Sequence, residues 1–473
     1  MNIVIVGCGY VGLVSGACLA RLGHHALCID LDRDRIEALK KGHCPIFEPG
    51  LTELIREGLQ NGHLAFAHQM PALTSAVDLV LIAVGTPPAA NGEDADLSGI
   101  FAVGREIAQK AVGKVLVVTK STVPPGTGDA LEDLIQRLRP DLAVAVASNP
   151  EFLREGSAID DFLKPDRIVV GANEHCASLA LRRLYHPLTE QGSPLVNTAR
   201  TAAEIIKYAA NAFLALKITF INEIADLCDA TQVDVREVAQ GIGHDRRIGP
   251  DFLRPGPGYG GSCFPKDTRA LASTARKYGV ALSLVEEAIA SNERRKKAMG
   301  AKVASALGGD LRGRHIAVLG LSFKPDTSDT RDSPATALIA SLLSQGALIS
   351  ACDPEARLEE PELTSAIERE KDPYQCAKNA DCVVLATEWK SFLKLDFARL
   401  AAAMRTPLMV DLRNALDHAK LARCGFRTVG LGIPPHRPVT LRATTLRRPV
   451  AQVAFAPVSV LNGSKRQQLA QPQ

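Results

Sequence analysis

The segment Asn2-Ile3-Val4-Ile5-Val6-Gly7-Cys8-Gly9-Tyr10-Val11-Gly12 decides the fold of the first part of the chain. Its first five residues have the apolar pattern of a buried parallel strand, and an apolar helix is expected from the glycines to about Leu22. The three glycines have the spacing Gly-x-Gly-x-x-Gly. Such glycines permit a tight turn and let a phosphate group approach the backbone at the helix N-terminus. The segment therefore predicts the opening strand, turn and helix of a Rossmann dinucleotide-binding domain.

An acidic residue stands where a dinucleotide site needs one. Asp30 follows Gly12 by 18 residues, at the end of a second expected strand. A carboxylate there can accept hydrogen bonds from a ribose diol and would repel a 2′-phosphate. The expected cofactor is therefore NAD rather than NADP, in contact with Gly7, Gly9, Tyr10, Val11, Gly12 and Asp30. The alternative is a glycine-rich turn in a fold that binds another nucleotide.

Two sections of the chain carry the alternating strand and helix signals of a doubly wound parallel sheet. In the first, further buried strands are expected at 78–84, 114–119 and 142–147. The second begins with a strand and turn at His315-Ile316-Ala317-Val318-Leu319-Gly320, and its further strands are expected at 347–351, 382–386 and 408–410. Between the two sections, residues 201–231 and 281–307 have long helical patterns, separated by a Gly- and Pro-rich loop at 241–261.

The expected fold class is therefore α/β, in four parts. These are an N-terminal Rossmann domain at 1–200, a central helical domain at 201–307, a smaller C-terminal Rossmann-like α/β domain at 308–433 and a basic tail at 434–473. Long apolar helices that join two domains commonly make dimer contacts, so we expect a homodimer through the central helices. The tail has six Lys or Arg and no Asp or Glu between residues 433 and 473; its Pro-rich, weakly periodic composition predicts disorder.

Composition excludes several classes of protein. Of the 473 residues, 46% are hydrophobic and 23% are charged, as in soluble globular proteins. No apolar run reaches the ~18 residues that a membrane span needs. The eleven cysteines form no Cys-x-x-Cys pair, which argues against a disulfide framework or a zinc site and favours a reducing cytoplasm. The basic residues of the tail sit on a mildly acidic body, which is not a nucleic-acid-binding surface.

A cysteine that could act as a nucleophile lies in Gly258-Tyr259-Gly260-Gly261-Ser262-Cys263-Phe264-Pro265-Lys266-Asp267. Pro265 favours a helix start, and a thiol at the positive end of a helix should have a lowered pKa. A thiol beside NAD can capture an aldehyde as a thiohemiacetal, which is again a hydride donor. The alternative is a buried structural cysteine beside a turn.

Three other polar residues, Lys207, Asn211 and Asp267, are candidates for oxyanion stabilisation and proton transfer. Lys207 and Asn211 are four apart in an apolar helical stretch and share one face, so the lysine could stabilise an alkoxide or oxyanion. Asp267 lies four residues after Cys263 and could take a proton or order a water. The alternatives are a snorkelling lysine with a capped amide, and an acid favoured by the first turn of a helix.

Several residues follow expected strand ends, where ligands of open α/β sheets bind. They are Thr86, Thr122, Glu151 and Glu155. The loop cations Arg247, Lys324 and Arg331 suit a diphosphate. Each of these residues could instead be a helix cap or a solvated charge.

Together these segments resemble the UDP-glucose/GDP-mannose dehydrogenase family over about residues 1–432. The motifs that carry the resemblance are 7–12, 45–51, 120–124, 148–156, 207–213, 258–267 and 323–331. One departure is Gly430-Leu431-Gly432-Ile433, where the family often has an arginine in the fourth position. The tail has no counterpart.

The resemblance implies a role for each matching residue. Cys263 would be the nucleophile, Lys207 and Asp267 would handle protons and oxyanions, Asn211 and Thr122 would position the hydrolytic water, and Glu151 would be a base or a water-ordering group. NAD would also contact Arg35, Thr86, Thr122, Glu155, Lys266 and Arg331. The nucleotide sugar would contact Glu151, Phe152, Leu153, Lys207, Asn211, Phe252, Leu253, Arg254, Pro255, Gly256, Gly260 and Lys324, with Arg247 reaching it from the neighbouring subunit. The C-terminal domain would bind UDP.

The activity implied is the oxidation of UDP-glucose to UDP-glucuronate with two NAD, through a thiohemiacetal and a thioester on Cys263. The alternatives are the same chemistry on GDP-mannose or a UDP-N-acetylhexosamine, a two-electron dehydrogenase, and a non-catalytic regulator that binds a nucleotide sugar. No metal is expected.

Overall fold

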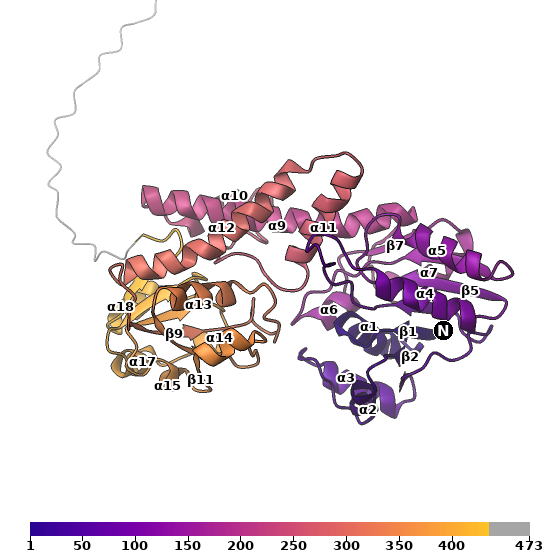
Figure 1. Ribbon diagram of the computed structural model, residues 1–473, viewed down its shortest axis with the longest axis horizontal. Coiled ribbons are helices and arrows are strands. Elements are labelled where there is room, and N and C mark those ends of the chain that lie inside the picture. The colour runs from indigo at the N-terminus through magenta and orange to yellow at the C-terminus, as the bar shows by residue number, and fades with distance from the viewer. Residues whose placement is uncertain (435–473) are drawn as a thin grey trace, which may run out of the picture. The chain divides into compact units, whose positions relative to one another are not determined.

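A computed structural model describes residues 1–434 (Figure 1). The expected basic tail lies outside the described residues, apart from Pro434. Within the described range, no helix is both long and apolar enough to cross a membrane.

The first sheet forms around β1 (Asn2–Val6), four of whose five residues are buried. Its strand order is β3-β2-β1-β4-β5-β6-β7-β8, and all neighbours are parallel except β6 and β7. The order 3-2-1-4-5-6 of its first six strands is that of a Rossmann domain. The other strands are β2 (His25–Ile29), β3 (Leu64–Ala67), β4 (Leu79–Ile82), β5 (Lys114–Thr119), β6 (Ala143–Ser148), β7 (Ile168–Ala172) and β8 (Leu195–Thr198).

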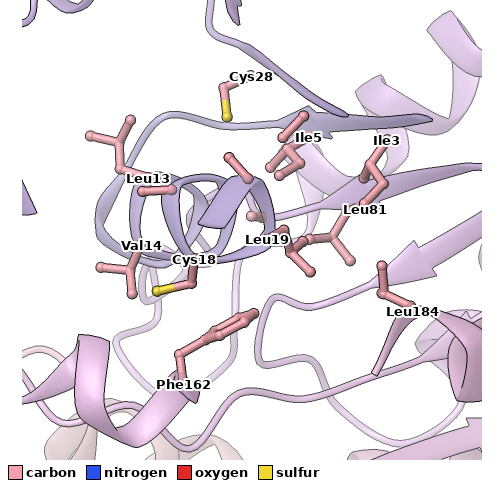
Figure 2. Close-up of a cluster of buried hydrophobic side chains, with 14 of the residues drawn as sticks. Ile3, Ile5, Leu13, Val14, Cys18, Leu19, Cys28, Leu81, Phe162 and Leu184 are labelled. Carbon is pink, nitrogen blue, oxygen red and sulfur yellow. The ribbon is translucent and has the colours of Figure 1, made fainter. Parts of the chain in front are cut away.

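Helix α1 (Tyr10–Arg21) packs against this sheet because most of its residues are small or apolar. Figure 2 shows Leu13, Val14, Cys18 and Leu19 of α1 among strand side chains such as Ile5, all in one buried cluster. The remaining helices of this part of the chain are α2 (Arg33–Lys40), α3 (Leu51–Gln60), α4 (Ser98–Lys110), α5 (Thr127–Leu138), α6 (Ala158–Leu163), α7 (His175–Leu184) and α8 (His186–Thr189).

The central section is helical. Its 32-residue helix α9 (Arg200–Thr231) contacts α11 (Phe264–Lys277) and α12 (Ser283–Ala306), and the short α10 (Val235–Gly243) packs on α9 as well. Because α11 starts directly after Cys263, the packing of α11 on α9 brings the cysteine loop to the face that carries Lys207 and Asn211.

The second sheet is fully parallel, with the order β11-β10-β9-β12-β13-β14. Its strands are β9 (His315–Leu319), β10 (Leu348–Cys352), β11 (Glu368–Glu370), β12 (Cys382–Leu385), β13 (Leu408–Asp411) and β14 (Arg427–Val429). Its helices are α13 (Pro334–Ser344), α14 (Pro361–Ala366), α15 (Pro373–Cys376), α16 (Lys390–Leu393), α17 (Phe397–Ala403) and α18 (His418–Arg423).

The two sheets share a local design at the first turn. Gly7 and Gly320 follow the first strand of each sheet with φ of +106° and +101°. An aspartate at the end of the next strand accepts a hydrogen bond from the turn in both cases: Asp30 from the Cys8 amide and Asp353 from the Leu321 amide, each at 2.7 Å. The predicted fold class, two Rossmann-like α/β domains with a helical section between them, is confirmed.

Candidate active site

Cys263 is the residue that precedes α11, and Pro265 lies in the first turn of that helix. The glycines before the cysteine shape its loop: Gly258 and Gly261 have φ of +126° and +84°. The Gly261 amide donates to the Arg331 carbonyl oxygen at 2.9 Å, which ties the loop to the segment after β9. The loop that carries Cys263 is therefore continuous with α11 at its end and is hydrogen-bonded to the C-terminal α/β section through Gly261.

The electrostatic setting of the thiol differs from the one predicted. Burial, together with the carboxylates of Glu151 and Asp267, raises the pKa of Cys263 to about 11, although Lys207 and the hydrogen bond between Cys263 and Ser262 act in the opposite direction. The prediction of a lowered pKa is therefore wrong, because a helix N-terminus contributes less than burial next to two carboxylates. The thiol is protonated at neutral pH and must lose its proton when it attacks.

Lys207 and Glu151 form a buried ion pair. The Nζ of Lys207 lies 3.0 Å from Oε1 of Glu151, and their side chains are 4% and 6% exposed. The second carboxylate oxygen of Glu151 accepts a hydrogen bond from the Leu153 amide at 2.5 Å. Burial alone would lower the pKa of Lys207, but Glu151, Cys263 and Asp267 outweigh it and raise that pKa above its ordinary value. Lys207 is therefore a fixed cation at neutral pH, suited to stabilise an oxyanion.

Asp267 is held from two sides. Its Oδ2 accepts a hydrogen bond from Asn211 Nδ2 at 2.7 Å, and its Oδ1 lies 2.5 Å from the Nζ of Lys266. The side chain is 1% exposed. The shared face of Lys207 and Asn211 thus meets α11 one turn after Cys263, as the four-residue spacing predicts.

The turn after β1 fits a dinucleotide. A Cβ on Gly7 would lie 2.6 Å from the Ala83 carbonyl oxygen, and a Cβ on Gly12 would collide with Gly7. At Gly9, by contrast, a Cβ would meet no atom within 4 Å, so that residue faces open space at the N-terminus of α1. Asp30 stands beside this turn and also contacts Arg35 Nη1 at 3.2 Å. The residues present therefore fit NAD.

Two strand-end segments meet beside the cofactor turn. The hydroxyl of Thr86 donates to the carbonyl oxygen of Thr122 at 2.9 Å. Thr122 also lines a small pocket with Lys207. Glu155 accepts hydrogen bonds from Ser262 at 3.2 Å and from Thr327 at 2.7 Å, and so it joins segments from all three sections of the chain. Burial and the nearby Asp329 raise the pKa of Glu155.

Comparison with known proteins identifies the family. Residues 1–189 match the NAD binding domain of the UDP-glucose/GDP-mannose dehydrogenase family, residues 201–294 its central domain and residues 317–418 its UDP binding domain. The chain belongs to the UDP-glucose/GDP-mannose dehydrogenase family.

Individual members of this family cover most of the chain. A protein of Rhizobium meliloti (strain 1021) named UDP-glucose 6-dehydrogenase is 51% identical over 436 residues, which cover 92% of this chain and all of the relative. The structure of a UDP-glucose dehydrogenase from Pyrobaculum islandicum has a TM-score of 0.82 and 36% identity, and covers 91% of this chain and 98% of its own. A UDP-D-ManNAc dehydrogenase from Pyrococcus horikoshii has a TM-score of 0.81 and 27% identity, with coverage of 91% and 99%.

In this family member, the predicted sugar-binding residues lie on four segments, at 151–153, 207–211, 247–260 and 324. Phe152 stacks against Arg167, whose guanidinium carbon is 3.7 Å from the ring centroid, and the ammonium of Lys207 is 5.3 Å from the same centroid. Lys324 lies close enough to Cys263 and Glu155 to feel their charges, although burial is the larger effect and lowers its pKa. Gly260 packs so closely that a Cβ would lie 2.4 Å from the Asp332 carbonyl oxygen.

The loop at 252–256 is attached to the central helices by hydrogen bonds and by apolar packing. The Gly256 amide donates to Asn222 Oδ1 at 2.8 Å, and its carbonyl oxygen accepts from Arg295. Leu253 is buried in a cluster with residues of α9 and α10, whereas Phe252 packs on Phe264. Pro255 is buried and Arg254 is exposed.

Two of the predicted cations, Arg247 and Arg331, form ion pairs with aspartates two residues earlier in the sequence. The exposed Arg247 pairs with Asp245 at 2.7 Å, and Arg331 pairs with Asp329 at 2.8 Å. Neither guanidinium forms an ion pair with Glu151, Glu155 or Asp267, the carboxylates around the thiol. The hydrogen bond from the Gly261 amide to the Arg331 carbonyl oxygen nevertheless keeps the Arg331 backbone next to the cysteine loop.

Several charged residues that lie near the candidate site were not singled out by the sequence analysis. Arg413 follows β13 and donates to the carbonyl oxygens of Phe323 at 2.5 Å and Ala386 at 2.8 Å, beside Gly256. Glu204, one turn before Lys207, accepts from the amides of Gly126 and Gly128 at the start of α5. Lys120 is buried behind Glu151. A charged residue within two positions of the end of a buried strand was the available signal for Lys120 and Arg413.

Proposed function

We propose that this chain oxidises UDP-glucose to UDP-glucuronate, with two NAD consumed for each sugar. The observation that carries the proposal is the placement of Cys263 next to the buried Lys207–Glu151 pair and Asp267, in a family member whose relatives include UDP-glucose 6-dehydrogenases. NAD, when bound at Gly7, Gly9, Gly12 and Asp30, supplies the hydride acceptor for each of the two oxidations. The exposed Leu31 beside Asp30 offers an apolar surface for a base.

The first oxidation converts the C6 alcohol to an aldehyde. The hydroxyl loses its proton and the carbon loses a hydride. Lys207 stabilises the negative charge that develops on the oxygen, because it remains protonated in its carboxylate surroundings. Glu151 and Asp267 are the carboxylates available to accept the proton.

Cys263 then retains the aldehyde. A carbon–sulfur bond forms between Sγ and the aldehyde carbon, and the thiol proton ends on the former carbonyl oxygen. The second oxidation removes the hydride from that carbon and the proton from the oxygen, which leaves a thioester. Water, positioned by Asn211 and Thr122, attacks the thioester; the carbon–sulfur bond breaks, the thiol regains a proton and the acid is released. Glu151 is our candidate for ordering that water or accepting its proton.

Other sugars are the second candidate, because the similar structure from Pyrococcus horikoshii is named a UDP-D-ManNAc dehydrogenase. A panel of UDP-glucose, UDP-N-acetylhexosamines and GDP-mannose, followed by NADH absorbance, separates the candidates. The proposal requires UDP-glucose to give the highest kcat/KM. A higher value with another sugar contradicts it, and tight sugar binding without NADH indicates a regulator.

We also propose a homodimer through α9. Phe213, Phe220 and Leu227 are spaced by seven residues, so they share a face of the helix, and they are 64%, 53% and 58% exposed in the single chain. A row of exposed large apolar side chains of this kind is typical of an interface. In such a dimer, Arg247 would reach the neighbouring sugar site. Sedimentation of Phe220→Asp should give a monomer, with Ile205→Asp near the helix start as a comparison; an unchanged dimer contradicts the choice of face.

A reducing cytoplasm is the compartment we propose. The eleven cysteines carry no disulfide, and seven of them are buried. A thiol nucleophile also requires reducing surroundings to remain active.

A further inference from the structure

Lys120 is a buried lysine at the carboxyl end of β5, and its side chain has no role in the chemistry described above. The residue is 4% exposed. Its Nζ donates to neutral groups: to Oδ1 of Asn149 at 3.1 Å, to the hydroxyl of Tyr185 at 3.4 Å and to the carbonyl oxygen of Asn149 at 3.5 Å. A buried ammonium is costly unless nearby groups compensate its charge, so these surroundings need an explanation.

Aromatic rings give part of the compensation. The Nζ lies 5.7 Å from the ring centroid of Phe162 and 5.9 Å from that of Tyr185, distances at which the ring faces attract a cation. The charge of Glu151 gives the rest. Burial lowers the pKa of Lys120 to about 8, Glu151 opposes that change and Lys207 adds to it. The ammonium is therefore still mostly protonated at neutral pH.

The hydrogen bonds of Lys120 fix the segment that carries Glu151. Asn149 accepts from Lys120 and from the Tyr185 hydroxyl through one oxygen, and its Nδ2 donates to the Val169 carbonyl oxygen at 2.8 Å. Its side chain is thus held at both ends. Glu151 follows Asn149 by two residues, across the conformationally restricted Pro150. The hydrogen bond from Lys120 fixes the position of Asn149, and the position of Asn149 in turn helps to fix that of the Glu151 carboxylate.

Lys120 and Glu151 also share a recess. Its lining includes both residues together with Phe152, Asp161, Arg167 and Tyr185. The charged and titratable groups that line this recess with Lys120 are Glu151 from the loop after β6, Tyr185 after α7, Asp161 from α6 and Arg167 before β7. Lys207 from α9 acts on Lys120 through its charge. Of these groups, Glu151 is the one that forms an ion pair with Lys207.

We propose that Lys120 is a positioning residue for Glu151: it holds the Asn149-Pro150-Glu151 segment and adds a second positive charge near the carboxylate, besides that of Lys207. The role rests on the proposed function, since it matters through the Glu151 carboxylate. Two carboxylates lie close to Cys263: Asp267 contacts the cation of Lys266, and Glu151 contacts that of Lys207. The charge of Lys120 adds to that of Lys207 and stabilises the negative charge of Glu151 beside Asp267.

Three variants separate charge from shape. Lys120→Met removes the charge and the hydrogen bonds, Lys120→Gln keeps a donor for Asn149 without the charge, and Lys120→Arg keeps the charge. Lys114→Met, at the exposed start of the same strand, is the matched control. For each, kcat and KM for UDP-glucose are measured from NADH absorbance across pH 5.5–9, with a thermal melt at each pH.

The proposal predicts a change in the pH profile of kcat. For Lys120→Met and Lys120→Gln, the pH below which kcat falls should move upward by roughly one unit, because loss of a nearby positive charge disfavours the ionised form of a carboxylate. At pH values below the point at which wild-type kcat itself has begun to fall, kcat of these variants should approach about one tenth of the wild-type value, with a smaller change in KM. Lys120→Arg and Lys114→Met should keep the wild-type profile.

Two results would overturn the proposal. One is an unchanged acid side of the profile in both Lys120→Gln and Lys120→Met. The other is an equal shift in Lys120→Arg, which would mean that shape rather than charge matters. Failure of the proposed function gives a different result: the wild type and Lys114→Met would then form no NADH from UDP-glucose at any pH. In that case the proposed role of Lys120 would also be wrong. If Lys120→Met does not fold, the Gln and Arg variants still decide the question.

Discussion

The Nζ of Lys207 lies 3.0 Å from Oε1 of Glu151, and both side chains are more than nine-tenths buried. This pair joins α9 to the segment after β6, next to the thiol of Cys263. Because the pair is buried and lies next to the thiol, the Lys207–Glu151 contact contributes both to the stability of the site and to its chemistry.

Removing one member of the pair should affect stability and activity together. Lys207→Met leaves a buried carboxylate without its partner, which should cost about 3–5 kcal/mol of unfolding free energy. The loss of an oxyanion-stabilising cation should lower kcat by about 10²–10³. Urea unfolding and NADH absorbance measure the two effects. Arg236→Met, which breaks the exposed pair with Asp234, is the control and should cost less than about 1 kcal/mol.

The double variant Lys207→Met/Glu151→Met separates the two contributions. It removes both buried charges, so the unfolding free energy should recover most of what either single variant loses. The activity should not recover, because neither group is present. A double variant as unstable as the sum of its singles would show that the two groups do not interact.

The thiol should react slowly at neutral pH. Because the pKa of Cys263 is raised to about 11, its rate of alkylation by iodoacetamide should keep rising from pH 7 to about pH 11. Lys207 lowers this pKa, so Lys207→Met should slow the reaction further at each pH. Peptide mass spectrometry follows Cys263 separately from the exposed Cys176, which serves as an internal reference. A rate for Cys263 that levels off below pH 9 would contradict the electrostatic description.

Asp30 should determine the use of NAD. Asp30→Ala removes the acceptor for a ribose diol, so the KM for NAD should rise by about tenfold or more, with little change in the KM for UDP-glucose. The preference for NAD over NADP should shrink at the same time. Asp34→Ala, four residues later and exposed in the first turn of α2, is the control. Equal KM values for NAD in Asp30→Ala and wild type would exclude Asp30 from the cofactor site.

Much of the fold follows from the sequence pattern. The strand expected at 114–119 has the observed bounds of β5, because its run of apolar β-branched residues ends at a polar segment. The strand expected at 142–147 is shifted by one residue, and that at 78–84 is longer than the observed β4. The antiparallel β7 was not predicted, because side-chain alternation does not give the direction of a strand.

The candidate site was predictable only in part. The shared face of Lys207 and Asn211 follows from local helix geometry, and Asn211 does contact Asp267. The pKa of Cys263 depends on Glu151, which is distant in sequence, and local reasoning about the helix N-terminus therefore gave the wrong direction. The burial of Lys120 likewise depends on Phe162 and Tyr185 from other elements.

The glycine loop should tolerate no side chain at Gly261. Its φ is +84°, and a Cβ there would lie 2.7 Å from the ring of Phe323. Gly261→Ala should lose about 1–3 kcal/mol of stability and most of the activity. Gly249→Ala is matched in backbone conformation, with a φ of +70°, but has nothing within 4 Å of the added Cβ. If both variants behave alike in melting and NADH assays, the close packing of Phe323 against the loop has no part in the effect.

The number of NADH molecules formed from each UDP-glucose tests the central claim most directly. With a limiting, known amount of UDP-glucose and excess NAD, the reaction is followed to its end by NADH absorbance. Retention of the half-oxidised sugar on Cys263 predicts two NADH for each UDP-glucose, with UDP-glucuronate as the product. An end point of one NADH for each sugar, with a free aldehyde as product, would contradict it.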